Sequence, residues 1–250
     1  MTEKRFPGST QKELQAGGRS VRAKYRSLFV GRRGLAPLLA YELANLFVLP
    51  VPGALGLALR RLFLPGLLGR CGRGVVFGRD ITLRHPHKIE IGDGAVIDDG
   101  AVLDAKGEAN LGLRIGAGAL IGRATILSCK EGSIVLGETC NISAGCSLLS
   151  ETTIEIGRGC FLAGNCYLVA GGNHPVKDTS RPIMDQPSAA KGGIRIGDDV
   201  WLGAGVTVLD GVTIGKGTVV GAGALVAASL PDYSYVVPDR RLRITDRRAL

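Results

Sequence analysis

An aliphatic residue recurs at every sixth position through much of the chain from residue 89 to residue 228. It is usually followed by Gly or another small or acidic residue, and a small residue tends to stand four positions further on. The aliphatic positions are Ile91, Ile97, Leu103, Ile115, Ile121, Leu127, Leu136, Ile142, Leu148, Ile156, Leu162, Leu168, Ile196, Leu202, Val208, Ile214, Val220 and Val226. A fixed period of this kind indicates a repeat architecture.

The period predicts an all-β prism wound from short parallel strands, with three hexads in each turn of the chain. The aliphatic residue should point inward, and glycine at the corners supplies positive φ at low cost. We expect the residue four places later to point inward near a corner, where it must be small. About six coils spaced about 4.8 Å apart give a rod about 30 Å long, whose ends need capping.

Two departures from the period mark candidate functional segments. Between Leu168 and Ile196 the chain spends 28 residues where six would continue the prism, so residues 170–193 must leave it as a loop. A smaller insertion, residues 106–112, interrupts the third coil position. The prism is expected over residues 71–230, followed by a carboxy-terminal tail over 231–250.

The chain ahead of the prism divides into a basic polar arm, residues 1–34, and an apolar segment, residues 35–70. From Gly34 to Leu59 the charged residue is Glu42, and the run is long enough to suggest a membrane-spanning helix. Pro50 and Pro52, with Gly53, interrupt it in the middle. The sequence therefore predicts two short apolar helices joined by a turn.

The formal net charge of +9 lies entirely in the first 70 residues, which hold 12 Lys and Arg against three acids. Arginines flank the apolar hairpin at positions 32, 33, 60, 61 and 70. One interpretation is contact with an anionic membrane surface. The other is packing on the rest of the protein or on a sister subunit. Nucleic-acid motifs are not found, and no partner of that class is expected.

No secretory signal precedes residue 34, so we expect a cytoplasmic location, with a peripheral position on the inner face of the membrane as the refinement. Four of the six cysteines, Cys140, Cys146, Cys160 and Cys166, fall in the small inward slot. They are interpreted as reduced core filler, the first two stacked below the last two, and not as a zinc site. His85 and His87 precede the first predicted coil, where a structural or solvent role is favoured.

Several stretches resemble the hexapeptide-repeat acyltransferases, a family of left-handed parallel β-helices, over roughly residues 75–237. They are Gly171-Gly172-Asn173-His174-Pro175 in the loop, the run from Ile196 to Leu209, and Ile214-Gly215-Lys216-Gly217 with Val220-Gly221-Ala222-Gly223-Ala224. The sugar and xenobiotic O-acetyltransferase branch is the most similar. The left-handed winding is implied by this resemblance.

The resemblance implies a homotrimer with active sites between neighbouring prisms and acetyl-CoA lying along the groove. His174 matches the general base, which takes the proton of a weakly nucleophilic alcohol. Gly203, Ala204 and Ala222 match backbone positions that bind pantetheine and the thioester oxygen. Trp201 matches an aromatic at the acyl end, although a packing role is equally open. No metal is implied.

The remaining candidate positions match the family pattern less closely. Asn173 and Arg181 lie in the loop, where Asp185 either orients His174 or is a solvated acid. Ser143 stands where many relatives have an acceptor-binding Asn. Lys216, Arg240, Arg241 or Arg243 would meet the CoA phosphates.

The leading hypothesis is a CoA-dependent O-acyltransferase acting on a saccharide or related polyol. A metal-dependent carbonic anhydrase of the γ type is the first alternative, but it needs three converging imidazoles. The second alternative is a non-catalytic scaffold anchored to a membrane by the apolar hairpin. The sequence leaves the acceptor open.

Overall fold

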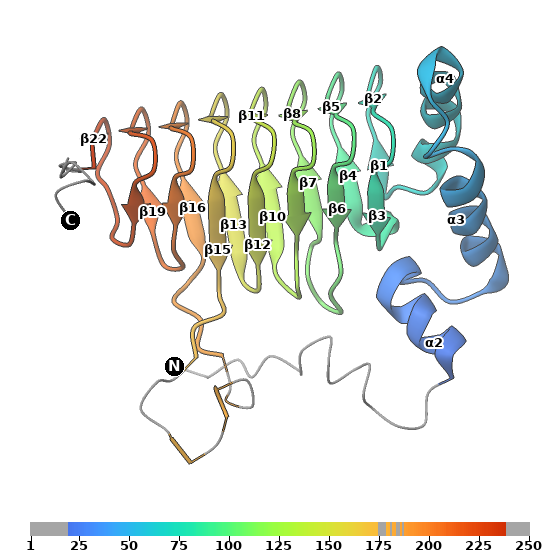
Figure 1. The fold of residues 1–250 in the computed structure, drawn as a ribbon, viewed down its shortest axis with the longest axis horizontal. Coiled ribbons are helices and arrows are strands. Elements are labelled where there is room, and N and C mark those ends of the chain that lie inside the picture. Colours follow the sequence, from blue (N-terminus) through green and yellow to red (C-terminus); the bar gives the residue numbers. More distant parts are fainter. Residues whose placement is uncertain (1–19, 175–178, 181, 184–185, 187, 239–250) are drawn as a thin grey trace, which may run out of the picture.

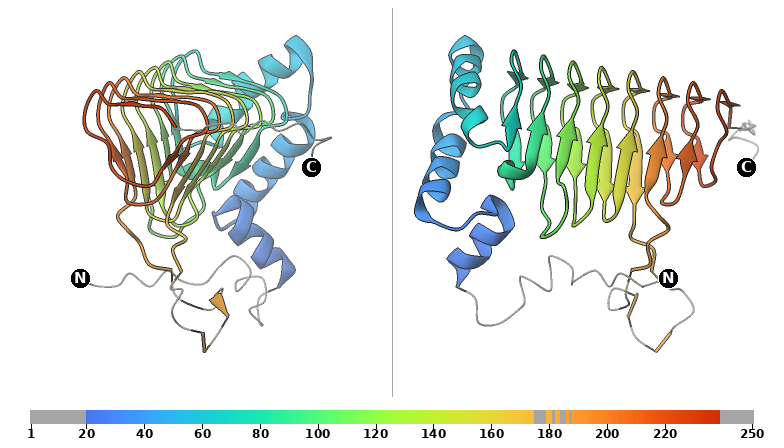
Figure 2. Two further views of the ribbon diagram at one scale, coloured as in Figure 1. Left: turned by 60° about the vertical axis from the view of Figure 1, so that its left-hand side comes forward. Right: turned by 180° about the vertical axis from the view of Figure 1, so that it is seen from behind.

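The computed structural model describes residues 20–174, 179–180, 182–183, 186 and 188–238. Most of these residues form a triangular prism of short parallel strands, with helices at its amino-terminal end (Figure 1). Seen obliquely along its axis, the prism shows three flat walls and three rows of corners (Figure 2). The expected left-handed parallel β-helix is confirmed.

Each wall of the prism is one parallel sheet. The first sheet is built from β1 (Arg70–Cys71), β4 (Ile89–Ile91), β7 (Leu113–Ile115), β10 (Ser133–Leu136), β13 (Thr153–Ile156), β16 (Ile194–Ile196) and β19 (Thr213–Ile214). The second is built from β2 (Val76–Phe77), β5 (Val96–Ile97), β8 (Leu120–Ile121), β11 (Asn141–Ile142), β14 (Phe161–Leu162), β17 (Trp201–Leu202), β20 (Val219–Val220) and β22 (Tyr235–Val236). The third is built from β3 (Thr82–Arg84), β6 (Val102–Asp104), β9 (Ile126–Ser128), β12 (Ser147–Ser150), β15 (Tyr167–Ala170), β18 (Thr207–Val208) and β21 (Leu225–Val226).

The predicted aliphatic positions are buried along the prism axis and stack on one another from coil to coil. In the second sheet, for example, Ile121 pairs with Ile142, which pairs with Leu162. All three side chains are fully buried. Because each coil buries its aliphatic residues against the next one, no coil has a core of its own.

The prism is longer than the six coils expected. It has seven complete coils, and the second sheet has an eighth strand, β22. At the amino-terminal end, β1, β2 and β3 form a coil that the hexad analysis missed. At the other end, β22 pairs with β20 inside the segment that the sequence analysis assigned to a tail.

The residue four places after each aliphatic position points inward but does not have to be small. Val200 and Val206 fill this slot in the sixth coil and are buried. In the first coil the equivalent slots hold Val75 and Ile81, also buried. The expectation of a small residue was therefore wrong. Because the first coil has Val75 and Ile81 in these slots, the hexad pattern did not reveal it.

The four slot cysteines are buried and free, as expected. Cys140 contacts Cys160 and Cys146 contacts Cys166, one coil apart. The thiols also hydrogen-bond to backbone carbonyls of the next coil, such as Cys140 Sγ to Gly157 O at 2.9 Å. These cysteines act as core filler.

Helices close the amino-terminal end of the prism (Figure 1). They are α2 (Val21–Tyr25), the π-helical turn η1 (Arg26–Val30), α3 (Leu35–Phe47), α4 (Gly53–Phe63) and the 3-10 turn η2 (Leu64–Gly66). The two apolar helices thus form where expected, while α2 and η1 lie in the segment interpreted as a polar arm. Among the described residues, no helix is both long enough and apolar enough to cross a bilayer.

The inner side of the hairpin packs on the first coil. Tyr41 of α3 donates its hydroxyl to Leu83 O at 2.8 Å, and Ala44, Val48 and Leu49 join the prism core. The packing interpretation is therefore correct for one side of each helix.

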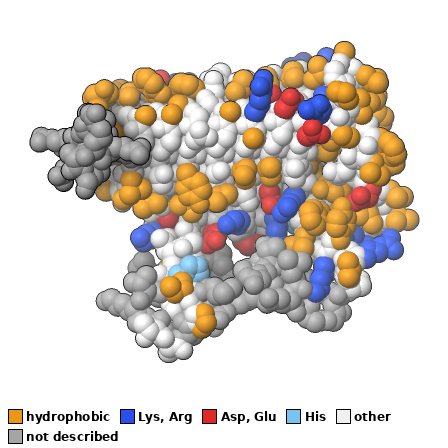
Figure 3. Space-filling model, viewed as in Figure 1, with side chains coloured by type: hydrophobic (Ala, Val, Ile, Leu, Met, Phe, Trp, Pro, Cys, Tyr) orange, Lys and Arg blue, Asp and Glu red, His pale blue; other side chains and the backbone are white. Residues whose placement is uncertain are grey.

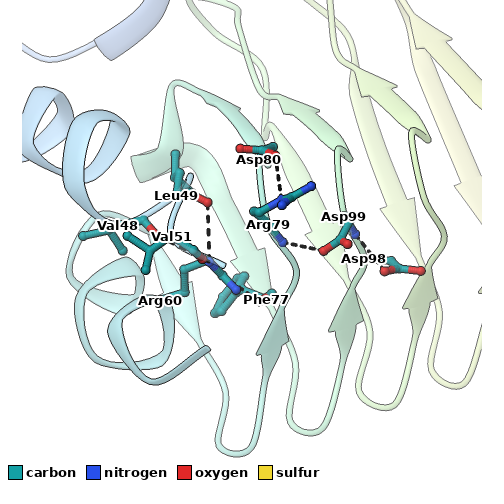
Figure 4. Close-up of polar contacts among 9 residues, drawn as sticks. All are labelled: Val48, Leu49, Val51, Arg60, Phe77, Arg79, Asp80, Asp98 and Asp99. Atoms are coloured by element: carbon teal, nitrogen blue, oxygen red, sulfur yellow. Dashed lines mark hydrogen bonds and ion pairs between the residues drawn. The ribbon is translucent and has the colours of Figure 1, made fainter. Parts of the chain in front are cut away.

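Arg60 departs from the expectation that it flanks the hairpin as a solvent-facing cation (Figure 4). Its side chain is buried and donates to Phe77 O at 2.9 Å and to Val51 O at 2.6 Å. Burial lowers the pKa of its guanidinium. Gly56 is needed beside it, because a Cβ there would lie 1.8 Å from Val51 O.

His85 and His87 lie after the first coil and not before it, since β3 ends at Arg84 and the 3-10 turn η3 spans Pro86–Lys88. His85 is buried, with Nε2 2.8 Å from Ser27 O, and its backbone N–H donates to Phe29 O. Burial lowers the pKa of His87 to about 4. These histidines hold η1 on the prism.

Candidate active site

The long loop leaves the prism after β15 and returns at β16, at the corner between the third and first sheets (Figure 1). Its two arms meet at an isolated antiparallel bridge between Asn173 and Ala189, where Ala189 N donates to Asn173 O at 2.7 Å. We call these two arms, residues 171–173 and 188–193, the neck of the loop. His174 follows the first arm directly.

Asp210 fixes the neck from the next coil. It is buried at the corner between β18 and β19, and it accepts three hydrogen bonds from the loop. Asn173 Nδ2 and the Lys191 N–H donate to Oδ2 at 2.7 Å each, and the Gly193 N–H donates to Oδ1 at 2.9 Å. Asn173 is thus engaged with the protein itself, which makes it a positioning residue.

Glu151 fixes the neck from the preceding coil. Its Oε2 accepts from the Gly172 N–H at 2.9 Å and from Ser188 Oγ at 3.3 Å. Gly171 is required at this contact, because its φ is +112° and a Cβ would lie 2.6 Å from Glu151 Cβ. Glu151 and Asp210 were not among the site residues expected from the sequence. The signal that could have identified them is an acid beside each corner that adjoins the loop.

His174 is exposed, with its Nδ1 3.3 Å from the backbone oxygen of Gln186. A carbonyl oxygen only accepts, so in this contact Nδ1 carries the proton and the lone pair is on Nε2. Imidazole in this tautomer can remove a proton from a bound hydroxyl. Arg181 and Asp185, the other loop candidates, lie outside the described residues.

The predicted CoA positions gather at another corner, between the second and third sheets. Trp201 is half-exposed on β17 and stacks on Phe161 of β14, with ring centroids 6.4 Å apart. Ser143 lies in the same row of corners, and its N–H donates to Leu162 O at 2.9 Å.

The backbone donors at this corner differ from one another. Gly203 is buried and its N–H already donates to Val220 O at 2.7 Å, so it has no free proton to offer a ligand. Ala204 and Ala222 are exposed, one coil apart, and within the described chain their N–H groups have no hydrogen-bond acceptor. These two amides are the available donors.

Lys216 lies at the third row of corners, between the first and second sheets. Its Nζ is 5.7 Å from the centre of the Tyr233 ring, and its N–H donates to Asp232. Arg240 lies outside the described residues. A single chain therefore places His174, the Ala204 and Ala222 amides, and Lys216 at three different corners.

Within the described ranges, no group of three His, Cys, Asp or Glu side chains could hold a metal ion. The three converging imidazoles that a γ-type carbonic anhydrase needs are not found there.

Residues 193–228 match the family model described as the bacterial transferase hexapeptide (six repeats). The match covers the coils from β16 to β21. A probable acetyltransferase of Mycobacterium tuberculosis is 34% identical over 125 residues, which cover 50% of this chain and 41% of that protein. The chain thus matches well under half the length of this relative.

Three solved structures resemble the fold. A maltose O-acetyltransferase from Clostridium difficile has 20% identity and a TM-score of 0.42, covering 92% of this chain and 91% of its own. A polySia-specific acetyltransferase has 22% identity and a TM-score of 0.47, covering 72% and 90%. An N-acyltransferase from Bacillus cereus, in complex with dTDP-4-amino-4,6-dideoxyglucose and coenzyme A, has 20% identity and a TM-score of 0.46, covering 73% and 86%.

Proposed function

We propose that this hexapeptide-repeat protein is an acyl-CoA-dependent O-acyltransferase that moves an acetyl group to a hydroxyl of a saccharide or related polyol. The observation that carries the proposal is the position of His174. Its Nε2 lone pair is presented on an extruded loop whose neck is held by Asp210 and Glu151. The match to a probable acetyltransferase supports the same reaction class.

In the proposed reaction, Nε2 of His174 takes the proton of the acceptor hydroxyl while the oxygen attacks the thioester carbonyl. The carbon–sulfur bond then breaks, and the departing thiolate takes that proton from the imidazolium. The products are an ester and free CoA. The hydrogen bond from Nδ1 to Gln186 O keeps the ring in the required tautomer.

The Ala204 and Ala222 amides fit acyl-CoA as donors to pantetheine carbonyls and to the thioester oxygen. Trp201 offers a flat apolar face at the same corner. Gly203 contributes no amide proton, and its burial instead lets neighbouring coils approach closely. Lys216 is the described candidate for the CoA phosphates.

We propose a homotrimer to account for the separation of these groups. Because His174 and the corner with the Ala204 and Ala222 amides lie on different edges of one prism, we expect a neighbouring prism to bring that corner to the loop. We propose a cytoplasmic location for this assembly, since CoA thioesters are used there.

The test is thiol release from acetyl-CoA with a panel of sugars and polyols. His174→Ala should lower kcat/KM by roughly 100-fold or more, the loss expected for a general base. Thr179→Ala is the matched control, since Thr179 is exposed in the same loop and, among the described residues, has no hydrogen bond to the neck. Both variants should keep the wild-type melting temperature.

Near-normal turnover by a folded His174→Ala variant would remove His174 from the mechanism. A wild-type protein that releases no thiol with any acceptor in the panel would favour a non-catalytic scaffold.

A further inference from the structure

The hairpin helices carry an apolar surface that faces away from the prism. We define this cap face by the large side chains that α3 and α4 expose, each between 46% and 72% accessible. They are Leu35, Leu39, Leu43, Leu46, Phe47, Leu55, Leu57, Leu62 and Phe63. Hydrophobic side chains gather at this end of the molecule (Figure 3).

The spacing of these residues is helical and their composition is unusual for a solvent-facing surface. Leu35, Leu39, Leu43 and Leu46 follow one side of α3, while Tyr41 and its neighbours pack on the prism from the other side. Every exposed residue of α3 is Leu, Ala or Phe. Along α3 the patch is therefore continuous, and a large exposed apolar patch marks an interaction site.

The charges around the cap face are almost all positive. Between positions 20 and 70, which include the helices of the cap, the sequence has eight Lys or Arg and a single acid, Glu42. Glu42 is half-buried and accepts a hydrogen bond from the Tyr25 hydroxyl at 2.6 Å. Arg32, Arg33 and Arg61 are exposed at the ends of α3 and α4.

We propose that the cap face docks on an anionic phospholipid bilayer, with the leucines among the acyl chains and the arginines at the phosphates. A protein partner would be expected to meet polar groups, because protein interfaces carry about one hydrogen bond per 100–200 Å². The cap face exposes aliphatic and aromatic carbon bordered by cations, which matches a lipid surface. The inner leaflet supplies such a surface in the cytoplasm. This docking does not depend on acyl transfer.

The test is flotation of the full chain with vesicles of phosphatidylcholine alone or mixed with phosphatidylglycerol. The wild-type chain should float with the mixed vesicles, and added salt should weaken this binding in part, since it screens the arginines and spares the leucines. A triple variant, Leu39→Gln, Leu43→Gln and Leu62→Gln, should lower the partition coefficient by roughly 100-fold. All three positions are at least half-exposed, so the fold should be unchanged.

Two further variants separate apolar from ionic contact. The pair Arg32→Gln and Arg33→Gln should lower partitioning onto mixed vesicles by roughly tenfold and leave binding to neutral vesicles unchanged. Leu111→Gln is the matched control, because Leu111 is 64% exposed in the loop between β6 and β7. It should float like the wild-type chain.

A wild-type chain that stays at the bottom of the gradient would overturn the proposal, as would a folded triple variant that floats normally. If sedimentation without vesicles shows higher assemblies that the triple variant abolishes, and no vesicle binding is seen, the face is covered by a second copy. Thermal melting reports folding. Should the triple variant unfold, the single variants Leu39→Gln and Leu62→Gln decide the question.

Discussion

Arg60 and Arg61 are adjacent in the sequence but have different roles. Arg61 is exposed on α4, whereas Arg60 turns inward and binds carbonyls from the loop between α3 and α4 and from strand β2. A buried guanidinium that meets carbonyls ties three segments together, because it supplies several donors in a fixed geometry. Arg60 is therefore part of the fold, whereas Arg61 is available to a partner.

Replacing Arg60 with Met should therefore destabilise the chain. The carbonyls of Phe77 and Val51 would lose their donor, and a buried unsatisfied acceptor costs about 1–3 kcal/mol. Arg61→Met is the control and should leave the free energy of unfolding within about 0.5 kcal/mol of wild type. Urea denaturation of both variants measures the difference. Equal midpoints would show that Arg60 is not a structural tie.

At the residue scale, the sequence offers candidates that stand in local motifs but not residues that act through long-range contacts. His174 and Trp201 were identified because they stand in short recognisable stretches. Asp210 and Glu151 were missed because their partners are 17 to 37 residues away along the chain. The same limit explains Arg60, whose burial depends on how the hairpin seats on β2.

At the level of the coil, corner glycines determine how closely successive turns can stack. Gly137 follows β10, and a Cβ there would lie 2.6 Å from Arg158 N and from Gly157 C of the next coil. Both of those atoms are backbone in a hydrogen-bonded turn, so neither can move aside. The hexad pattern requires glycine here for space and not for positive φ.

Gly137→Ala should accordingly destabilise the prism by roughly 1–3 kcal/mol, the cost of overpacking a close contact. Gly66→Ala in η2 is the matched control, since no atom lies within 4 Å of its added Cβ. Thermal unfolding followed by circular dichroism compares the two. An unchanged melting temperature for Gly137→Ala would mean that the coils can spread at that corner.

The hexad period predicted the strands in the middle of the prism, but not the strands at the two ends of the prism. Interior coils repeat a strict environment, because each is enclosed by a coil on both sides. The first coil meets α3 and α4 instead, and its inward slots hold Val75 and Ile81 in place of small residues. The carboxy-terminal strand β22 likewise lacks a hexad signal, and its pairing with β20 is seen only in the fold.

Across the whole molecule, the cap face and the loop are well separated along the prism axis. From β3 to β15 the third sheet steps through four coils, which is about 19 Å at the strand spacing. A docked prism standing on the bilayer would therefore hold its loops beyond the lipid headgroups. The two proposals are independent, and the cap-face variants should keep full thiol release with a soluble acceptor.

The proposed subunit arrangement leads to a prediction about mixed assemblies. If His174 of one protomer works with the Ala204 and Ala222 amides of its neighbour, two different inactive variants should complement each other. His174→Ala removes the base, and Ala204→Trp covers the donor corner with a side chain that can point to solvent. In a ring of mixed protomers, about a quarter of the interfaces pair an intact loop with an intact corner.

Co-refolding equal amounts of the two variants should therefore restore about a quarter of the wild-type rate, while each variant alone stays near background. Sedimentation should show a trimer of 26.1 kDa subunits in all three samples. Refolding each variant with wild type provides the control for exchange between assemblies. No recovery from a mixture that has exchanged subunits would place the base and the amide donors in the same protomer. In that case the loop would have to fold back along the third sheet to reach the corner beside Ala204, and the requirement for a neighbouring prism would fall away.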